Sequence, residues 1–425
     1  MSRAKRSRSY VVGFFAVTWC ASSVMASDWP RFRGPSGSGV SADSAEAPAR
    51  WGEDFNLKWK TALPGRGSSS PIVISDHIYL TYWSGYGTER GNPGDQADLR
   101  RNLTCIHCDT GEIQWTTPVE PYLPEDPYGG MFAQHGYASH SPVSDGERVY
   151  VFFGKTGAFA FDMDGNQLWQ TSVGTESDPR DWGSASSPIL YKDLLIVTAS
   201  AEGEALVGLN KHTGKEVWRQ EASGLNSTWG TPILVDVDDD RTDLVIGVPF
   251  EIWGLNPETG KMRWLCEAMD TETFCSSVLH GDGLVFGIEG RNGGSIAIRT
   301  GGKGDITETH VAWSGRDANR IGTPVFYDGR IYFFSRGVAN CIDAETGEEI
   351  FQSRLDRASS GGGGGREQGR AAGGGGRGQG RGRGGFGGDY SSPVVADGKL
   401  YYISRAGEAF VLKAGTTFEQ LATNS

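Results

Sequence analysis

Short apolar runs recur along the chain, and most are introduced by a Ser-Pro or Thr-Pro pair. The first is SSPIV from Ser69, followed by IYL, and the last is SSPVV from Ser391, followed by LYYIS. Such runs, rich in β-branched and aromatic residues and separated by turn residues, predict β-strands. The third position of the unit falls at Pro71, Pro142, Pro188, Pro232, Val278, Pro324 and Pro393. The unit therefore recurs seven times, about 45 residues apart where no insertion intervenes.

A second element follows the first and consists of a strand, a Thr-Gly turn and a strand that ends in an aromatic residue. Examples are CIHCDTGEIQW from Cys105 and GLNPETGKMRW from Gly254. Four short strands in about 45 residues are typical of a propeller blade, so the pattern predicts an all-β chain folded as a β-propeller. We expect the terminal aromatic of each unit to pack between blades as a structural docking residue. These aromatics are Trp115, Trp169, Trp218, Trp264 and Phe351.

The first 26 residues have the pattern of an export signal. Arg3 and Lys5 begin a positive stretch, residues 11–19 are apolar, and the sequence before Ser27 offers small residues for cleavage. No later run reaches the roughly 18 apolar residues that a membrane-spanning helix needs. We therefore expect a periplasmic or extracellular protein that does not span the membrane. Its expected parts are a signal peptide (1–26), an N-terminal extension (27–50) and a propeller (51–425).

Composition narrows the possible partners. The formal net charge is −12, and it becomes more negative once the cationic signal is removed. That balance argues against nucleic acid as a partner. Residues 358–388 are mostly glycine with arginine and glutamine, which predicts a disordered, basic loop within the propeller.

The repeat resembles a known family. The Thr-Gly-x-x-x-Trp element is similar to the docking motif of quinoprotein alcohol dehydrogenases and of other pyrroloquinoline-quinone (PQQ) repeat proteins. The run WPRFRGPSGSGVS from Trp29 resembles the start of a PQQ-like propeller family of exported bacterial proteins. More distantly, the chain is similar to the propeller lipoprotein of the outer-membrane barrel-assembly machinery, which is a non-enzymatic scaffold.

The resemblance implies an eight-bladed ring, whereas the chain holds seven repeats. NLKWKTAL from Asn56 looks like a fourth strand without its first three, and FEQLATNS at the end stands where an eighth copy should begin. We therefore expect an eight-bladed type with an incomplete last blade. A ring that closes with seven blades is the alternative.

The resemblance leaves two functions to weigh. A quinoprotein needs a flat platform for PQQ, basic groups for its carboxylates and a calcium ion held by oxygen ligands. Quinoprotein alcohol dehydrogenases carry an adjacent cysteine pair, and no two cysteines are adjacent here. The favoured interpretation is an exported, non-enzymatic binding or scaffold protein that needs no cofactor, with cell-envelope assembly as one setting. A PQQ-dependent oxidoreductase that binds PQQ with calcium is the alternative.

Two local clusters leave alternatives open. Asp236, Asp238 and Asp240 could bind a metal ion, although Arg241 stands where a calcium loop has its glycine, so a solvated hairpin turn is the plainer interpretation. Cys266 and Cys275 could form a short disulfide or remain two thiols.

Propeller geometry indicates where a site should lie. The connections between blades and the turns after each second strand emerge on one face, and loops on a rigid scaffold are where function concentrates. We predict that this face binds a polar ligand or a protein partner. Its candidate residues are Lys155, Trp182, Glu202, Trp229, Glu251, Glu289, Arg291, Arg316, Arg320, Arg336 and Arg405.

Overall fold

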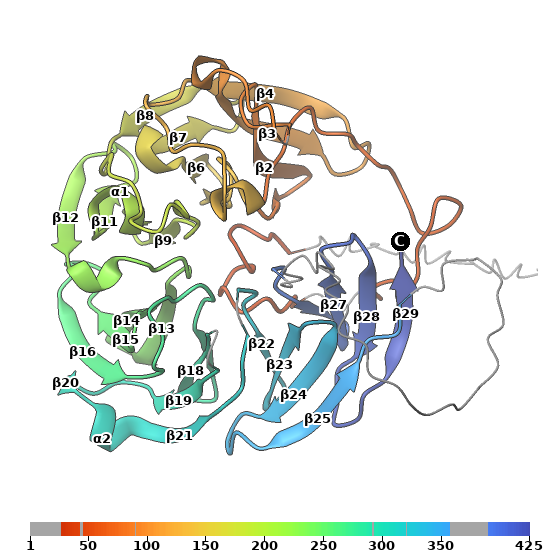
Figure 1. Ribbon diagram of the computed structural model, residues 1–425, viewed down its shortest axis with the longest axis vertical. Coiled ribbons are helices and arrows are strands. Elements are labelled where there is room, and N and C mark those ends of the chain that lie inside the picture. Colours follow the sequence, from red (N-terminus) through yellow and green to blue (C-terminus); the bar gives the residue numbers. More distant parts are fainter. Residues whose placement is uncertain (1–26, 43–45, 90, 291–292, 320, 358–389) are drawn as a thin grey trace, which may run out of the picture.

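The computed structural model describes residues 27–42, 46–89, 91–290, 293–319, 321–357 and 390–425. The expected signal peptide, the glycine-rich loop at 358–388, Arg291 and Arg320 lie outside these residues. In these residues, seven sheets, each built on four antiparallel strands, are arranged as blades around a central axis (Figure 1). Within the described ranges, no helix is long and apolar enough to cross a membrane.

Each blade is a meander whose strands follow chain order from the axis outward. Blade 1 comprises β1 (Ile72–Ile74), β2 (His77–Ser84), β3 (Arg100–His107) and β4 (Ile113–Val119). Blade 2 comprises β5 (Val143–Ser144), β6 (Arg148–Phe152), β7 (Ala158–Asp162) and β8 (Gln167–Thr171). Blade 3 comprises β9 (Ile189–Tyr191), β10 (Leu194–Ala199), β11 (Ala205–Asn210) and β12 (Glu216–Glu221). Blade 4 comprises β13 (Ile233–Asp238), β14 (Arg241–Val248), β15 (Glu251–Leu255) and β16 (Met262–Glu267), with β20 (Gly304–Asp305) added in parallel at its edge.

The last three blades follow the same order. Blade 5 comprises β17 (Leu279–Gly281), β18 (Leu284–Ile288), β19 (Ser295–Arg299) and β21 (Val311–Gly315). Blade 6 comprises β22 (Val325–Tyr327), β23 (Arg330–Ser335), β24 (Val338–Asp343) and β25 (Glu349–Arg354). Blade 7 comprises β26 (Val394–Ala396), β27 (Lys399–Ile403), β28 (Ala409–Lys413) and β29 (Gln420–Asn424). The helices are short: α1 (Ser200–Gly203), α2 (Thr307–His310), and the 3-10 turns η1 (Gln96–Asp98), η2 (Phe132–Gln134), η3 (Gly154–Thr156) and η4 (Ser223–Leu225).

In blades 1 to 6, the register of the two outer strands pairs a small residue with an aromatic one. Gly254 of β15 lies opposite Trp264 of β16, and Gly208 of β11 lies opposite Trp218 of β12. A Cβ atom on Gly254 would lie only 2.0 Å from the Trp264 indole, so the glycine is needed to admit the ring. The glycine of each Gly-Leu-Asn segment therefore provides the space that the terminal tryptophan fills.

Several of the terminal aromatics contact the next blade. The indole N–H of Trp115 donates to the carbonyl of Met163 in blade 2, and that of Trp169 donates to the carbonyl of Lys211 in blade 3. Trp218 packs against Gly260 of blade 4, as a Cβ there would lie 2.4 Å from its ring. Phe351 also contacts the next blade, where it meets Phe418 edge-on at 5.9 Å. Trp264 differs, because its indole bonds Asp243 within its own blade.

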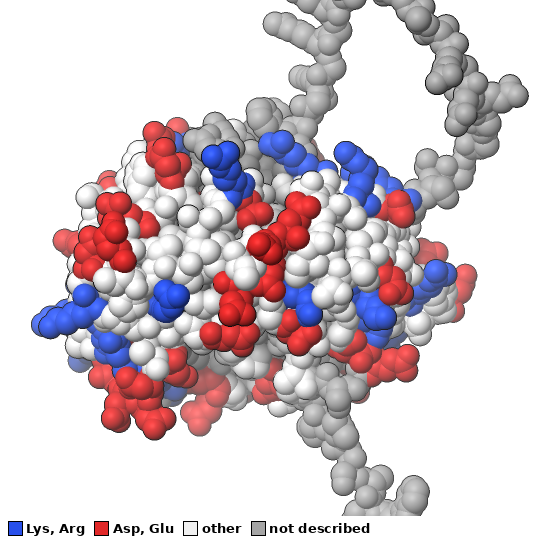
Figure 2. Space-filling view, turned by 90° about the horizontal axis from the view of Figure 1, so that it is seen from below, with Lys and Arg blue, Asp and Glu red and all other residues white. Residues whose placement is uncertain are grey.

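Apolar side chains fill the junctions between neighbouring blades. In the described part of the chain, six core clusters occupy the six junctions from blades 1 and 2 to blades 6 and 7. Acidic and basic side chains are interspersed over the face of the ring seen in Figure 2. Blades 2 to 6 therefore bury both faces against their neighbours and blades 1 and 7 bury one, which is the reason a lone repeat could not fold.

The ends of the ring are joined by the N-terminal residues. FEQLATNS does not begin an eighth copy, because Gln420–Asn424 forms β29 and completes blade 7; that expectation was wrong. Residues 56–63 form no strand in the described structure, yet Trp59 donates to the carbonyl of Cys108 at 2.7 Å and Thr61 to that of Gly111 at 2.5 Å. Trp169 and Thr171 make the equivalent bonds to Lys211 and Gly214 of the following blade. Residues 56–63 therefore dock on blade 1 as the last strand of a preceding blade would.

Candidate functional site

A cavity of about 1330 Å³ lies on the propeller axis, among the connections between blades. Its rim carries Trp182 and Trp229, whose ring centroids lie 5.0 Å apart. The Trp229 indole donates to the carbonyl of Gly183 at 2.7 Å, which holds this pair in place. We call this cavity the funnel. Its size is that of a ligand-binding cleft rather than of a packing defect.

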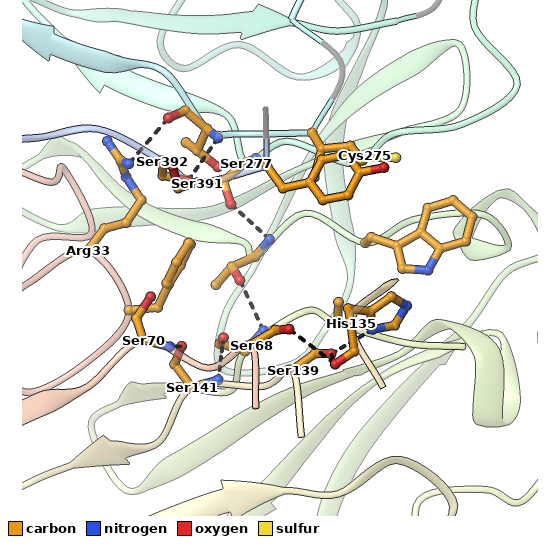
Figure 3. Close-up of a pocket in the computed structure, with 18 of the residues that line it drawn as sticks. Arg33, Ser68, Ser70, His135, Ser139, Ser141, Cys275, Ser277, Ser391 and Ser392 are labelled. Atoms are coloured by element: carbon orange, nitrogen blue, oxygen red, sulfur yellow. Dashed lines mark hydrogen bonds between the residues drawn. The ribbon is translucent and has the colours of Figure 1, made fainter. Parts of the chain in front are cut away.

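The wall of the funnel is a ring of hydroxyl groups. They belong to the residue before the repeated third position of each unit: Ser70, Ser141, Ser187, Thr231, Ser277, Thr323 and Ser392. The backbone N–H of each residue donates to the hydroxyl of the next blade, from Ser70 to Ser392, in six bonds of 2.9–3.0 Å. Figure 3 shows part of this chain of bonds. We refer to the seven residues as the hydroxyl ring.

The floor of the funnel is formed by residues 29–41, which link the innermost strands of blades 1 and 7. Trp29 exchanges backbone hydrogen bonds with Val73, and residues 39 and 41 do so with Val395. Arg33 lines the funnel and donates to the carbonyls of Ser38, Thr323, Pro324 and Pro393 at 2.6–3.3 Å. The sequence marks this run only as a family resemblance, and no local signal reveals that its arginines reach the axis.

Arg31 lies near Arg33, and both are buried. Arg31 donates to the carbonyl of Pro232 at 3.4 Å. Burial lowers the pKa of Arg31 to about 10 and that of Arg33 to about 9. Gly39 allows the segment to curl around its own side chain, because a Cβ there would lie 2.4 Å from the Arg33 guanidinium. The glycines of GPSGSG thus serve the close approach of backbone to arginine.

Glu289 is a buried acid in the funnel wall, directly after β18. Its carboxylate accepts hydrogen bonds from the N–H and the hydroxyl of Ser276, at 2.9 and 3.0 Å. Burial raises its pKa to about 8, although these bonds act in the opposite direction. Glu289 is therefore mostly protonated at neutral pH.

The raised pKa of Glu289 predicts a pH-dependent stability difference. The unfolded chain releases this proton near pH 4 to 5, whereas the folded protein holds it up to about pH 8, so stability falls as pH rises between those values. Glu289→Gln replaces the carboxyl group with an amide of similar shape that does not ionise. We expect it to melt like the wild type at pH 5 and several degrees higher at pH 8, in thermal denaturation at both pH values. Equal melting temperatures at pH 8 would contradict the assignment.

Two other predicted face residues are buried beside the funnel rather than in its wall. Lys155 is paired with Asp126 of the insertion between blades 1 and 2, at 2.7 Å, and also bonds Ser177. Glu202 accepts a bond from Ser184, and burial raises its pKa to about 7. The insertion at 120–135 supplies the carboxylate that pairs with Lys155, and the sequence does not indicate that it folds back over this residue.

The remaining predicted residues differ in their surroundings. Glu251 accepts a bond from the indole of Trp253, and Arg316 and Arg336 are exposed. Arg405 lies over the ring of Tyr390 at 4.7 Å and donates to Gln134; both partners line the funnel. The structure therefore brings Trp182, Trp229 and Glu289 together in the funnel wall, with Arg405 at its edge.

The acidic cluster in blade 4 is a hairpin between β13 and β14. Asp238 accepts the N–H of Asp240 at 3.0 Å, and Asp236 accepts the hydroxyl of Thr242 at 2.7 Å. Elsewhere in the described ranges, as here, no three His, Cys, Asp or Glu residues are grouped to hold a metal ion. No disulfide joins Cys266 and Cys275, so the thiol alternative applies.

The described residues do not fit PQQ with calcium. A calcium ion needs several oxygen ligands, and the part of the chain that the structure describes offers no such group. Trp182 and Trp229 pack on each other at a centroid distance of 5.0 Å, so a planar cofactor ring would not fit between the two indoles. The funnel nevertheless has basic and hydroxyl donors that suit an acidic ligand.

Comparison with known proteins agrees with this architecture. A family model described as outer membrane protein assembly factor BamB matches residues 96–228 and 195–417. The structure resembles BamB from Moraxella catarrhalis at 15% identity and a TM-score of 0.50, over 82% of this chain and 95% of that one. It also resembles a europium-containing methanol dehydrogenase at 10% identity and a TM-score of 0.51, over 92% of this chain and 90% of that one. No curated protein matches the sequence.

These likenesses to solved structures concern the fold, because the identities are low. The family model is a different kind of finding, since its two matches together span most of the chain. The protein belongs to the PQQ-repeat β-propeller family described as outer membrane protein assembly factor BamB.

Proposed function

We propose that this protein is an exported, non-enzymatic binding protein that holds part of a protein partner in its funnel, in the periplasm or outside the cell. The observation that carries the proposal is the funnel itself, a cavity of about 1330 Å³ with an aromatic rim and a wall held fixed by seven blades. Concave sites with aromatic walls and a few placed polar groups are typical of binding sites. The family's description as an assembly factor supports a protein partner and a setting in the cell envelope.

The polar groups of the funnel support binding rather than catalysis because most of them are engaged in structure. His135 contacts the hydroxyl of Ser139 at 2.6 Å through Nδ1 and the carbonyl of Trp182 at 2.7 Å through Nε2. Burial lowers its pKa, which disfavours the charged form. Arg180 is paired with Glu272 at 3.2 Å. A histidine with both ring nitrogens engaged is poorly placed to act as a general base.

A peptide-binding experiment tests the proposal. A pool of short synthetic peptides is passed over the mature protein, and the retained peptides are identified by mass spectrometry and titrated individually. Trp182→Ala removes a partly exposed aromatic from the rim, and we expect it to lower the affinity for the retained peptides about tenfold or more. Phe55→Ala is the matched control, because Phe55 is 53% exposed and does not line the funnel.

Two results would overturn the proposal. Equal affinities for the wild type and Trp182→Ala would place peptide binding outside the funnel. A saturable rise in melting temperature that requires both PQQ and Ca²⁺, together with PQQ-dependent oxidation of alcohols, would favour the oxidoreductase instead.

A further inference from the structure

We infer that the floor of the funnel binds an anionic oxygen group, a carboxylate or a phosphate, through Arg33 and the hydroxyl ring. This inference rests on the proposed role of the funnel as a binding site. It names the chemical group of the ligand that contacts the floor. Three observations support it independently: the uncompensated charge of the buried arginines, the unused hydrogen-bond donors, and the distribution of acidic residues along the funnel.

The first support is uncompensated charge. Arg31 and Arg33 are 6% and 3% exposed, and no Asp or Glu of the described residues lies within ion-pair distance of either. Their guanidinium groups contact only backbone carbonyls. Buried charges are normally paired with an opposite charge, because carbonyl dipoles replace only part of the lost hydration. An anion at the floor would supply the missing charge.

The second support is a set of hydrogen-bond donors that the protein does not use. The Nε atom of Arg33 is buried and has no partner among the described residues. Each hydroxyl from Ser141 to Ser392 accepts a backbone N–H and keeps its own O–H to donate. All of these hydroxyls line the funnel together with Arg33. Figure 3 labels Ser141, Ser277 and Ser392 among them. Their complement is a group rich in acceptors, such as a carboxylate or a phosphate.

The third support is the distribution of charge along the funnel. The acids that line it are Asp270, Glu272 and Glu289. Glu272 is paired with Arg180, and burial raises the pKa of Glu289 to about 8, so neither carries an unpaired negative charge at neutral pH. Asp270 is exposed to solvent and is the one acid of the three without either compensation. Residues 29–41 close the floor, so the group that reaches Arg33 is the end of a ligand. We therefore expect the C-terminal carboxylate of a partner polypeptide to occupy this place.

The experiment compares two sources of the anion. Peptides retained in the pool experiment are titrated as free acids and as C-terminal amides, and inorganic phosphate is tested by thermal shift at constant ionic strength against chloride. We expect the free acid to bind at least about tenfold more tightly than the amide. We also expect phosphate to raise the melting temperature in a saturable way.

Variants locate the binding. Thr231→Val and Thr323→Val each remove one hydroxyl of the ring and keep the side-chain shape. We expect both to weaken binding of the free-acid peptide and to reduce the rise in melting temperature that phosphate causes. Thr171→Val is the matched control, since Thr171 donates to the carbonyl of Gly214 at 2.7 Å and does not line the funnel. If the ring variants fail to fold, the comparison of acid and amide on the wild type still decides.

The outcomes separate this inference from the proposed function. Acid and amide peptides that bind equally, with no phosphate shift, would overturn the anion site while leaving peptide binding at the rim intact. A phosphate shift of the same size in wild type, ring variants and control would also overturn it, as a general salt effect. A phosphate shift lost only in the ring variants, without an effect of amidation, would support the site with a small free anion as its ligand.

Discussion

Replacing Arg33 with alanine is expected to lower the free energy of unfolding by about 3 kcal/mol. The side chain ties residues 29–41 to blades 6 and 7 through the carbonyls of Thr323, Pro324 and Pro393, and it also bonds the carbonyl of Ser38 within its own segment. Its removal leaves these four acceptors without their donor. The variant also avoids the desolvation cost of burying a cation. The expected loss of stability is therefore smaller than the sum of the contributions of four hydrogen bonds. Because the same residues join blade 1 to blade 7, the change also weakens the closure of the ring.

Chemical denaturation followed by tryptophan fluorescence measures this effect, in chloride buffer without phosphate. Arg316→Ala is the control, because Arg316 is exposed, and we expect a change within about 0.5 kcal/mol. Unfolding of Arg33→Ala at the same denaturant concentration as the control would contradict this prediction. It would mean that water donates hydrogen bonds to the carbonyls as well as Arg33 does, and that the N-terminal residues do not hold the ring closed.

Replacing Asp243 with alanine is expected to cost about 3 kcal/mol as well, for a different reason. Asp243 is buried in β14 and accepts hydrogen bonds from Arg241, from Arg263 and from the indole of Trp264 at 2.8 Å. Without it, two guanidinium groups lose their counter-charge and the indole N–H loses its acceptor. The nearby Asp240 is exposed, so Asp240→Ala should change stability by less than about 0.5 kcal/mol.

The pH dependence of the Asp243 effect gives a second check. Burial alone raises the pKa of this carboxyl, but the bonds from Arg241, Trp264 and Arg263 outweigh it and hold the pKa below its usual range. The stabilisation by Asp243 is therefore complete above about pH 4, near the pKa of an Asp in the unfolded chain. It is lost as the pH falls through the lower pKa that Asp243 has in the folded protein. The difference between wild type and Asp243→Asn should shrink as the pH falls below 4. A difference that stays constant down to pH 2 would contradict the ion-pair account.

Much of the funnel was within reach of sequence reasoning, although its parts were not recognised as a site. The Ser-Pro and Thr-Pro pairs marked the start of each blade, and the residue before the proline proved to be the hydroxyl ring. Trp182, Trp229 and Glu289 were predicted from the general geometry of a propeller and line the funnel. The same geometry selected Lys155 and Glu202, which are buried beside the funnel, with Lys155 paired with Asp126 of the insertion.

The sequence by itself determined the repeat, the four strands of each blade and the small residues that face the terminal aromatics. These features are local, because strand, turn and cross-strand pairing depend on residues a few positions apart. Only the tertiary structure decided that Arg33 reaches the axis, since its carbonyl partners Thr323 and Pro393 lie 290 and 360 residues away. It also decided that blade 7 is complete, that residues 29–41 join the ends of the ring and that residues 56–63 dock on blade 1. Contacts between distant segments form only when seven blades close around one axis, and no local pattern encodes that closure.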